Sequence, residues 1–461
     1  MSTKKSTHIA GTFLIQVDAA FLNGAGLGEG EDQNVTLPKT FRDGKNEVPY
    51  VSSQAWKRWL RNTLIEETGW PPSELKAIGW NPKGNVSKIA AELNPVEFAE
   101  DDIFGYMRAE KGQGRKFSQE EETLEQEEEP AKGRIKSIIR ASPFMASLLI
   151  SLRSSWWKGQ DEGFVHLTKY DSSKLAEAEI ERFLETINRS SDKKKNIWDR
   201  LRDINNDLAS KAKSLVEQSD LGSLRKLLSE NAGGKTINFI ENPVSPLPYT
   251  TRFYNANLQG IFCLNYSRLG IYWNLGDRIE LEEDKVKQFL KNGTIKDSTN
   301  EEPYRALSED GKIGKIYRIT NNPRKERASA LFKALAMLRG GAKQAQFGTD
   351  VSPKVLIVTG LTCGNPIFNH LFKDDQEGLI LKIETFKEIV KDYADRIATS
   401  VFIGIRSGYL KNENEVRELA GSYIIEQNNL KKVPEKGRVP QIIIEVLTPI
   451  EAAQKIGESL P

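Results

Sequence analysis

Histidine and cysteine are scarce in this chain of 461 residues. The three histidines are His8, His166 and His370, and no Cys-x-x-Cys or His-x-x-x-His spacing occurs. These absences argue against a zinc site and leave few parts for a nucleophile–histidine relay. The two cysteines, Cys263 and Cys363, lie far apart in the sequence and indicate no disulfide framework. We therefore expect no metal, no cofactor and no catalytic residue.

Long apolar runs are also lacking. No stretch approaches the length of a membrane-spanning helix. The first five residues, Met-Ser-Thr-Lys-Lys, have no signal-peptide core behind them. We therefore expect a cytoplasmic protein without a membrane partner.

Common nucleotide-binding motifs are absent as well. The sequence has no Walker A motif, and the glycines from 24 to 30 do not form a dinucleotide fingerprint. Their loop carries Glu29, Glu31 and Asp32, which would repel a pyrophosphate, and no helix opens directly after it. The aromatic RNP signature of RRM domains is missing too. Base stacking on an open sheet face is therefore not indicated.

Charge is present in separated blocks of opposite sign. The formal net charge is only +2. Residues 117–130, however, hold seven glutamates and no basic residue. The following block, residues 132–158, holds no acid and six basic residues: Lys132, Arg134, Lys136, Arg140, Arg153 and Lys158. Such blocks create local fields that the average conceals, so nucleic acid is not excluded as a ligand.

The hydrophobic pattern predicts an α+β fold. Alternating apolar residues from Ile9 to Val17 indicate a first strand, and the apolar stripe Trp56, Leu60 and Leu64 indicates a helix from Ser53 to Glu66. Further predicted elements are a hairpin over Leu258–Asn274 with its turn near Ser267, a helix over Arg324–Leu338, and strands over Lys354–Leu361, Ser400–Ile405, Tyr423–Glu426 and Gln441–Leu447. This order, with long insertions, fits an open ferredoxin-like sheet.

The predicted helix after Pro49 carries the most informative cluster of charges. Lys57, Arg58 and Arg61 are spaced so that their side chains crowd one side of the helix. Ser52 or Ser53 can cap its N-terminus. With Gln54 they lie where unpaired N–H groups favour anions. Phosphate binding fits this combination, and the alternative is an amphipathic helix with a solvated basic face.

A second candidate is the sequence Arg339-Gly340-Gly341-Ala-Lys343-Gln344, between a basic helix and an apolar strand. Two glycines allow a backbone to approach a ligand closely, and the flanking cations supply charge. The alternative is a helix C-cap glycine followed by a turn.

Two weaker candidates follow the same logic. One is the acid-free segment with Arg134, Lys136 and Arg140, whose alternative role is a sheet edge protected by charge. The other is Thr250-Thr-Arg252-Phe-Tyr254, where an aromatic and a cation alternate as they do in segments that stack on bases and pair with phosphates. Its alternative is a strand with one buried aromatic.

Several of these segments resemble the RAMP superfamily of CRISPR proteins. The run Pro-Tyr-Val-Ser-Ser-Gln-Ala-Trp-Lys-Arg-Trp-Leu-Arg over residues 49–61 is similar to the Pro-Tyr-Ile-Pro-Gly-Ser-Ser-Leu-Lys-Gly run of that group, although serine, glutamine, alanine and arginine replace its glycines and serines. Asp102-Ile-Phe-Gly-Tyr106 and Arg140-Ala-Ser-Pro143 resemble its Phe-Gly and Ser-Pro elements. Together with the double glycine at 340–341, their order resembles the DevR branch of Cas family seven, the backbone subunit of type I Cascade.

The resemblance implies an RRM-like (ferredoxin-like) palm with a helical finger insertion and a thumb hairpin. The palm would comprise residues 8–110, 133–172 and 323–461. Composition predicts a disordered acidic loop at 111–132, a helical region in the insertion at 173–242, and a charged, loop-rich insertion at 276–322. Residues 243–275 would hold a thumb candidate with a palm hairpin. Within 243–275, the thumb itself would be Pro243–Ala256.

The same resemblance implies the partners. The chain would bind a guide crRNA through its phosphates, form a filament with further copies of itself, and join other Cascade subunits. Target DNA would be bound through the guide, which carries the sequence specificity.

Two alternatives have other functions. Type III RAMP backbone subunits cleave RNA with an aspartate between the first strand and first helix, where this chain has Asp32 and Asp43. Asp43 also fits an ordinary Arg-Asp-Gly-Lys turn. The second alternative is a DevR-type autoregulatory protein, against which the lack of a helix-turn-helix pattern counts. We expect an RNA-binding subunit that is not an enzyme.

Overall fold

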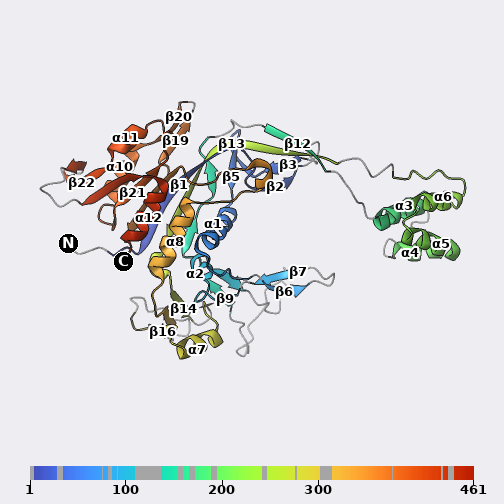
Figure 1. Cartoon of the computed structure of the whole chain (residues 1–461), viewed down its shortest axis with the longest axis horizontal. Coiled ribbons are helices and arrows are strands. Elements are labelled where there is room, and N and C mark those ends of the chain that lie inside the picture. The colour runs from blue at the N-terminus through green and yellow to red at the C-terminus, as the bar shows by residue number, and fades with distance from the viewer. Residues whose placement is uncertain are drawn as a thin grey trace, which may run out of the picture. The chain divides into compact units, whose positions relative to one another are not determined.

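The protein is described here from a computed structural model (Figure 1). The residues that the structure describes are 5–28, 35–74, 76–80, 86–90, 92–108, 137–153, 159–165, 172–187, 195–240, 247–275, 278–301, 314–375, 377–426, 429–433 and 441–461. They form two compact units. The first comprises Met1–Leu27, Thr36–Gln160 and Arg252–Pro461, and the second comprises Gly28–Val35 and Asp161–Thr251. Helices and a large sheet occur together in the first unit, as the predicted α+β class requires.

The large sheet is the framework of the first unit. Its strands lie side by side in the order β23 (Asn429–Val433), β22 (Gly421–Glu426), β24 (Ile442–Leu447), β21 (Val401–Ile405), β18 (Val355–Leu361), β1 (His8–Ala20), β13 (Leu247–Leu264), β11 (Leu149–Ser151), β5 (Asn46–Val51) and β4 (Thr40–Asp43). Strand β10 (Phe144–Ala146) also pairs with β13, and β2 (Gly24–Leu27) pairs with β3 (Val35–Pro38). The structure confirms the predicted first strand as β1, and the four strands predicted after residue 353 as β18, β21, β22 and β24.

Strand β1 lies at the centre of the sheet. It pairs antiparallel with β13, where Phe13 faces Gly260, and with β18, where Phe13 faces Leu356. Strand β13 in turn pairs antiparallel with β11. Four neighbouring strands thus have the order β18-β1-β13-β11. Helix α1 (Ser53–Thr68) lies between β1 and β11 in the sequence, and α8 (Arg324–Ala336) between β13 and β18.

Both faces of this sheet are covered. On one face α1, α8 and α12 (Pro449–Ser459) bury a core that includes Phe13 and Trp56, and α1 and α8 are direct neighbours (Figure 1). On the other face Leu14 packs with Phe386 of α10 (Ile383–Asp392). The shorter elements of this region are α9 (Gln344–Phe347), β19 (Phe372–Asp375), β20 (Gly378–Leu381) and α11 (Glu413–Glu418).

Helix α1 forms where the sequence predicted it. Ser52 is its N-cap, and the Ser52 side chain accepts a hydrogen bond from the Ala55 N–H. Gly69 ends the helix with a φ of 68°, a conformation that suits glycine. The predicted stripe of Trp56, Leu60 and Leu64 is fully buried. This stripe fixes which side of α1 remains available to a ligand.

A smaller sheet in the first unit has its own core. Its order is β16 (Ile295–Asp297), β17 (Lys315–Ile319), β14 (Ile271–Leu275), β15 (Arg278–Ile279), β9 (Ser137–Arg140) and β8 (Tyr106–Arg108). Helix α7 (Glu283–Lys291) packs Phe289 into this core with Tyr272. The prediction of a loop-rich insertion at 276–322 is therefore wrong for the described residues of that range, since they form strands and a helix.

The predicted hairpin over Leu258–Asn274 is also wrong. A turn does occur at a 3-10 helix over Tyr266–Arg268. However, β13 before it belongs to the large sheet, whereas β14 after it pairs with β17 and β15 in the smaller one. The chain changes sheets at this corner instead of returning on itself.

The second unit contains the helical region that the composition predicted. Its helices are α3 (Ser172–Thr186), α4 (Ile197–Ile204), α5 (Asn206–Glu217) and α6 (Leu221–Glu230). They bury a separate core, in which Phe183, Leu201 and Leu224 are inaccessible to solvent. The fully buried Glu179 forms an ion pair with Arg225 at 2.7 Å, and the positive charge of Arg225 compensates the negative charge of Glu179.

The remaining elements are β6 (Lys76–Trp80), β7 (Val86–Ala90), α2 (Ala99–Phe104) and β12 (Gly159–Val165). The acidic loop predicted at 111–132 and residues 243–246 of the thumb candidate lie outside the described residues, while Leu247–Ala256 belong to β13. In the described part of the chain, no helix has both the length and the apolar character needed to cross a membrane.

Candidate functional site

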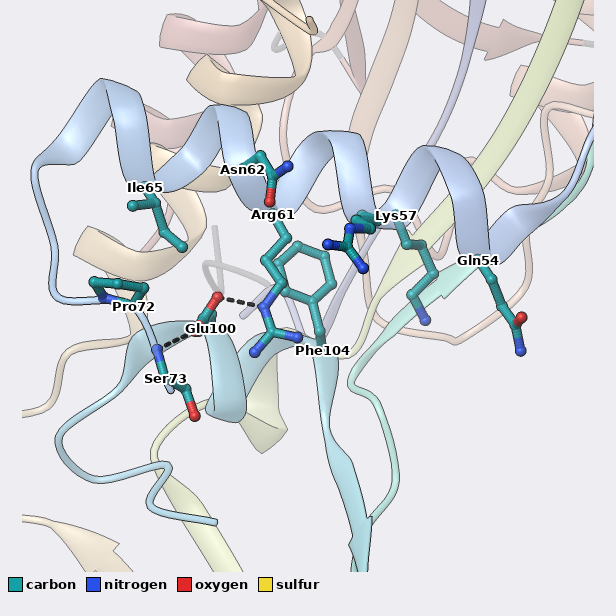
Figure 2. A pocket seen from close by; sticks show the side chains of 10 residues that line it. Gln54, Lys57, Arg61, Asn62, Ile65, Pro72, Ser73, Glu100 and Phe104 are labelled. Carbon is teal, nitrogen blue, oxygen red and sulfur yellow. Dashed lines mark hydrogen bonds and ion pairs between the residues drawn. The ribbon is translucent and has the colours of Figure 1, made fainter. Parts of the chain in front are cut away.

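A cavity of about 350 Å³ lies beside α1 (Figure 2). Its walls come from α1, from the segment directly after α1, and from α2. The lining residues are Gln54, Lys57, Arg58, Arg61, Asn62, Ile65, Pro72, Ser73, Glu100 and Phe104. The predicted cations of α1 are therefore brought together at a single concave site.

Lys57 and Arg58 carry the positive charge of this cavity. The Lys57 ammonium donates a hydrogen bond to Ser142 Oγ at 3.2 Å. Burial lowers the pKa of Lys57 below its usual value, because the charged form loses hydration. Arg58 is exposed, and no carboxylate among the described residues pairs with it. A ligand anion would supply the charge partner that both side chains lack.

Arg61 is held differently. Its Nε atom donates to Glu100, and its terminal nitrogen lies 3.5 Å from Asp101. Both carboxylates are almost fully buried, whereas 28% of the Arg61 side chain is exposed. Burial raises the pKa of Asp101, although hydrogen bonds from Asn94 and Ser73 and the charge of Arg61 oppose this. Arg61 thus neutralises two acids at the cavity wall.

Glu100 also ties the cavity wall to the segment after α1. Its second oxygen accepts the backbone N–H of Ser73. Figure 2 shows Arg61 and Ser73 reaching Glu100 from two sides. One carboxylate therefore fixes the Arg61 guanidinium and the cavity edge at Ser73.

The segments that carry the resemblance meet at this site. Gly105 has a φ of 70°, and a Cβ there would come within 2.7 Å of the Ser142 backbone nitrogen. Only glycine lets the Phe-Gly segment lie so close to the Ser-Pro segment. Ser142 in turn accepts the bond from Lys57. Three segments distant in sequence are therefore in contact beside the cavity.

Arg140 does not belong to the surface. Its side chain is fully buried and forms ion pairs with Asp102 and, at 2.9 Å, with Glu280. Arg268 also forms an ion pair with Glu280, and Arg327 forms one with Asp102. The prediction that Arg140 contacts phosphate is wrong, because its charge is compensated inside the protein. Arg134 and Lys136, predicted with it, lie outside the described residues.

The double glycine has a packing role. Gly340 and Gly341 have φ angles of 152° and 113°. A Cβ on Gly340 would lie 2.6 Å from Trp59 Cβ, and one on Gly341 would lie 2.9 Å from Leu22. Close approach of this loop to α1 and to the segment after β1 accounts for both glycines, without a ligand.

The polar residues of that loop are largely engaged by the protein. Arg339 pairs with Glu66 at 3.0 Å and Glu67 at 2.8 Å, and these bonds raise its pKa. Gln344 donates to the Gly340 carbonyl. Lys343 has a φ of 52° and lies 5.3 Å from the centre of the Phe21 ring.

The loop is linked to the helix N-terminus. The Ala342 N–H donates to the Leu22 carbonyl at 3.0 Å, and the Ser52 N–H donates to Asn23 Oδ1 at 3.1 Å. Ser52, Ser53 and Gln54 therefore lie at the end of α1 that is joined to the glycine loop through the segment after β1.

The last candidate segment lies in β13. Tyr254 is 1% exposed and belongs to the main core, so the prediction that it stacks on bases is wrong. Arg252, two positions earlier, is half-buried. The alternative interpretation, a strand with a buried aromatic, is correct for Tyr254.

Sequence reasoning missed the apolar walls of the cavity. Ile65, Pro72 and Phe104 provide these walls, and Asn62 of α1 also lines the cavity. Phe104 packs edge-on against Phe144, with ring centres 6.0 Å apart. The sequence feature that could have pointed to Phe104 is the Phe-Gly pair at 104–105. This pair indicates a family motif, but it does not show that Phe104 lines a cavity.

Asp43, the described member of the candidate nuclease pair, lies at a strand end opposite Asn46, and Gly44 between them has a φ of 61°. The predicted turn is confirmed. Asp32 lies outside the described residues. Within the described ranges, no three His, Cys, Asp or Glu side chains are grouped to hold a metal ion.

Comparison with known proteins gives only distant similarity. No family model matches the sequence, and no curated protein matches it. A chain of a "CRISPR RNA-guided surveillance complex" aligns over 98% of this chain and 100% of its own length, with 10% identity and a TM-score of 0.36. A chain of a "CRISPR RNA-guided surveillance complex, pre-nicking" aligns over the same shares, with 11% identity and a TM-score of 0.37. TM-scores of this size carry no weight for fold or function, so the residues of the cavity must carry the functional assignment.

Proposed function

We propose that this chain is a non-catalytic backbone subunit of a CRISPR Cascade, which binds the spacer part of a crRNA through its phosphates. The observation that carries the proposal is the cavity beside α1. There, two cations without a carboxylate partner among the described residues, Lys57 and Arg58, stand where three segments with a RAMP-like sequence meet.

The chemistry of the site favours phosphate. A backbone phosphate would restore to Lys57 the charge stabilisation that burial removes. Arg58 can bind a phosphate with two parallel N–H donors. The N-terminus of α1 adds a partial positive charge one turn away. None of these groups reads a base, so the contacts would be independent of sequence.

The strand order supports an RRM-like palm as the framework. Strands β18-β1-β13-β11 with α1 and α8 follow the β-α-β-β-α-β order of ferredoxin-like folds. The fingers would be α3 to α6, and the thumb would be the part of Pro243–Ala256 that precedes Tyr254, because Tyr254 and Ala256 are buried in the core of the large sheet. Copies would multimerise along the guide, join other Cascade subunits and present the guide for pairing with target DNA.

The test is the salt dependence of guide affinity. For a single strand, removal of one protein–phosphate ion pair lowers the slope of log K against log salt by about 0.7. Lys57→Ala with Arg58→Ala should therefore flatten the slope by about 1.4, equally on two unrelated guides. Lys387→Ala with Arg417→Ala removes the same formal charge from α10 and α11 and should leave the slope unchanged. An unchanged slope in the first variant would remove α1 from the interface.

The absence of catalysis is a separate part of the proposal. The assembled complex should leave a complementary RNA intact in the presence of a divalent metal. Cleavage that disappears in Asp32→Ala or Asp43→Ala would instead favour the type III-like ribonuclease.

A further inference from the structure

The cavity beside α1 has two ends of different chemistry. Gln54 and Ile65, which both line it, are separated by three helical turns, or about 16 Å along the helix axis. Figure 2 shows Lys57 toward Gln54 and shows Ile65 and Pro72 at the opposite, apolar end. Arg58 follows Lys57 in α1 and also lines the cavity. A sugar-phosphate chain alone would satisfy the first end and leave the apolar walls of the second without a partner.

Arg61 stands between the two ends and is unsuited to phosphate. Its guanidinium is already paired with Glu100 and Asp101, and their negative charge would oppose an incoming phosphate. The same two carboxylates fix the plane of the guanidinium. Part of the side chain remains exposed to the cavity. A fixed and charge-compensated guanidinium is a surface on which an unstacked base can lie.

We propose that the apolar end of this cavity takes one nucleobase of the bound strand, stacked on the Arg61 guanidinium and packed against the apolar side chains Ile65, Pro72 and Phe104, while Lys57 and Arg58 hold the adjoining phosphates. This inference rests on the proposed function. The volume of about 350 Å³ belongs to both ends of the cavity together, and it lies within the range of pockets that hold small organic ligands. Every base has a π-face, so the contact tolerates any guide sequence.

The experiment compares two probes, a short single-stranded RNA and the same oligonucleotide with abasic riboses. Wild type should bind the intact RNA roughly tenfold more tightly than the abasic RNA, because the abasic RNA lacks the one stacked base per site. Arg61→Lys keeps a cation for Glu100 but has no planar group, so its preference should fall toward one. Lys57→Ala with Arg58→Ala should weaken both probes equally and keep the preference.

A second variant guards against misfolding of the first. Ile65→Lys places a long, flexible and non-planar side chain in the apolar end, leaves Arg61, Glu100 and Asp101 unchanged, and should also abolish the preference. A 2-aminopurine placed in the RNA should be quenched on binding to wild type and less quenched in either variant. Binding to neither probe would overturn the proposed function itself. Equal binding of both probes by wild type, or a preference that survives in Arg61→Lys, would overturn the base pocket and leave phosphate binding in place.

Discussion

Arg58 and Arg140 belong to two clusters of cations that look alike in the sequence and differ in the folded chain. Arg58 is exposed beside the α1 cavity, and no carboxylate in the described ranges pairs with it. Arg140 is fully buried, and Asp102 and Glu280 compensate its charge. In addition, its guanidinium lies 4.8 Å from the centre of the Tyr272 ring.

The comparison shows that the partner, and not the residue type, decides what an arginine does. Removing a charge from water costs several kcal/mol unless an opposite charge and hydrogen bonds replace the missing hydration. Arg140 also donates to the carbonyls of Asp102, Ile271 and Arg268. A buried cation with such carboxylate and carbonyl partners stabilises the fold, whereas a cation without these partners remains available for a ligand.

The largest effect should follow from breaking the buried cluster. Arg140→Ala would leave Asp102 and Glu280 with less compensation in the core and should lower the free energy of unfolding by about 3–5 kcal/mol. Urea denaturation measures this. Arg58→Ala is the matched control and should stay within about 0.5 kcal/mol of wild type. Equal small effects of both substitutions would mean that the cluster contributes no more than a surface charge.

The contact between the two motif segments should be the next most sensitive. Gly105→Ala places a Cβ against the backbone of Ser142 and also forces a positive φ. Gly44→Ala has a similar φ and open space around it, so it should cost only the conformational term of about 1–2 kcal/mol. Thermal unfolding should therefore show a larger loss of stability for Gly105→Ala, and a loss equal to that of Gly44→Ala would rule out the backbone clash.

The loss of stability on removing Arg61 should fall between the losses on removing Arg140 and Arg58. Arg61→Ala removes the ion partner of Glu100 and Asp101, but part of the site is exposed, so water can compensate. We expect a destabilisation of about 1–2 kcal/mol in urea denaturation, below that for a fully buried pair. Glu100→Gln combined with Arg61→Ala should recover part of it, because less uncompensated charge remains. No recovery would mean that packing, rather than charge, causes the destabilisation.

The smallest predicted effect concerns pH. Burial lowers the Lys57 pKa, and a bound phosphate favours the protonated form. RNA affinity should therefore be full below the Lys57 pKa of the free chain and should fall as the pH rises through it, earlier than an ordinary lysine allows. Lys57→Arg should remove this fall, because arginine stays charged. Dissociation constants between about pH 7 and pH 10 test this, and identical profiles for the two proteins would contradict it.

Local features of the fold could be predicted from the sequence. The burial of Trp56, Leu60 and Leu64 follows from helical periodicity alone, and the Ser52 cap follows from residue type. Strands β1 and β18 and helix α8 could be predicted in the same way, because each depends on a short pattern. Strand β11 was not predicted, and β13 was predicted only in part, within the hairpin that the structure contradicts.

The site could be predicted only in part, because its walls depend on distant pairing. Asp102 and Arg140 are 38 residues apart, and Glu280 is 140 residues from Arg140. Nothing in a local pattern distinguishes Arg140, which finds these acids, from Arg58, which does not. The spacing of Arg61 fits a phosphate-binding cation and a solvated surface cation equally well. The buried carboxylates of α2, Glu100 and Asp101, give it a third role, because they form ion pairs with it.

The corner at Tyr266–Arg268 joins the two sheets through the main chain. The chain leaves the large sheet at Leu264 and enters the smaller one at Ile271, and between them the Gly270 N–H donates to the buried Asp102 at 2.9 Å. Loss of order in the smaller sheet would therefore expose Asp102 and release the end of β13. Such a corner joins both sheets into one cooperative unfolding unit, so their amide protons should exchange with solvent at similar free energies of opening.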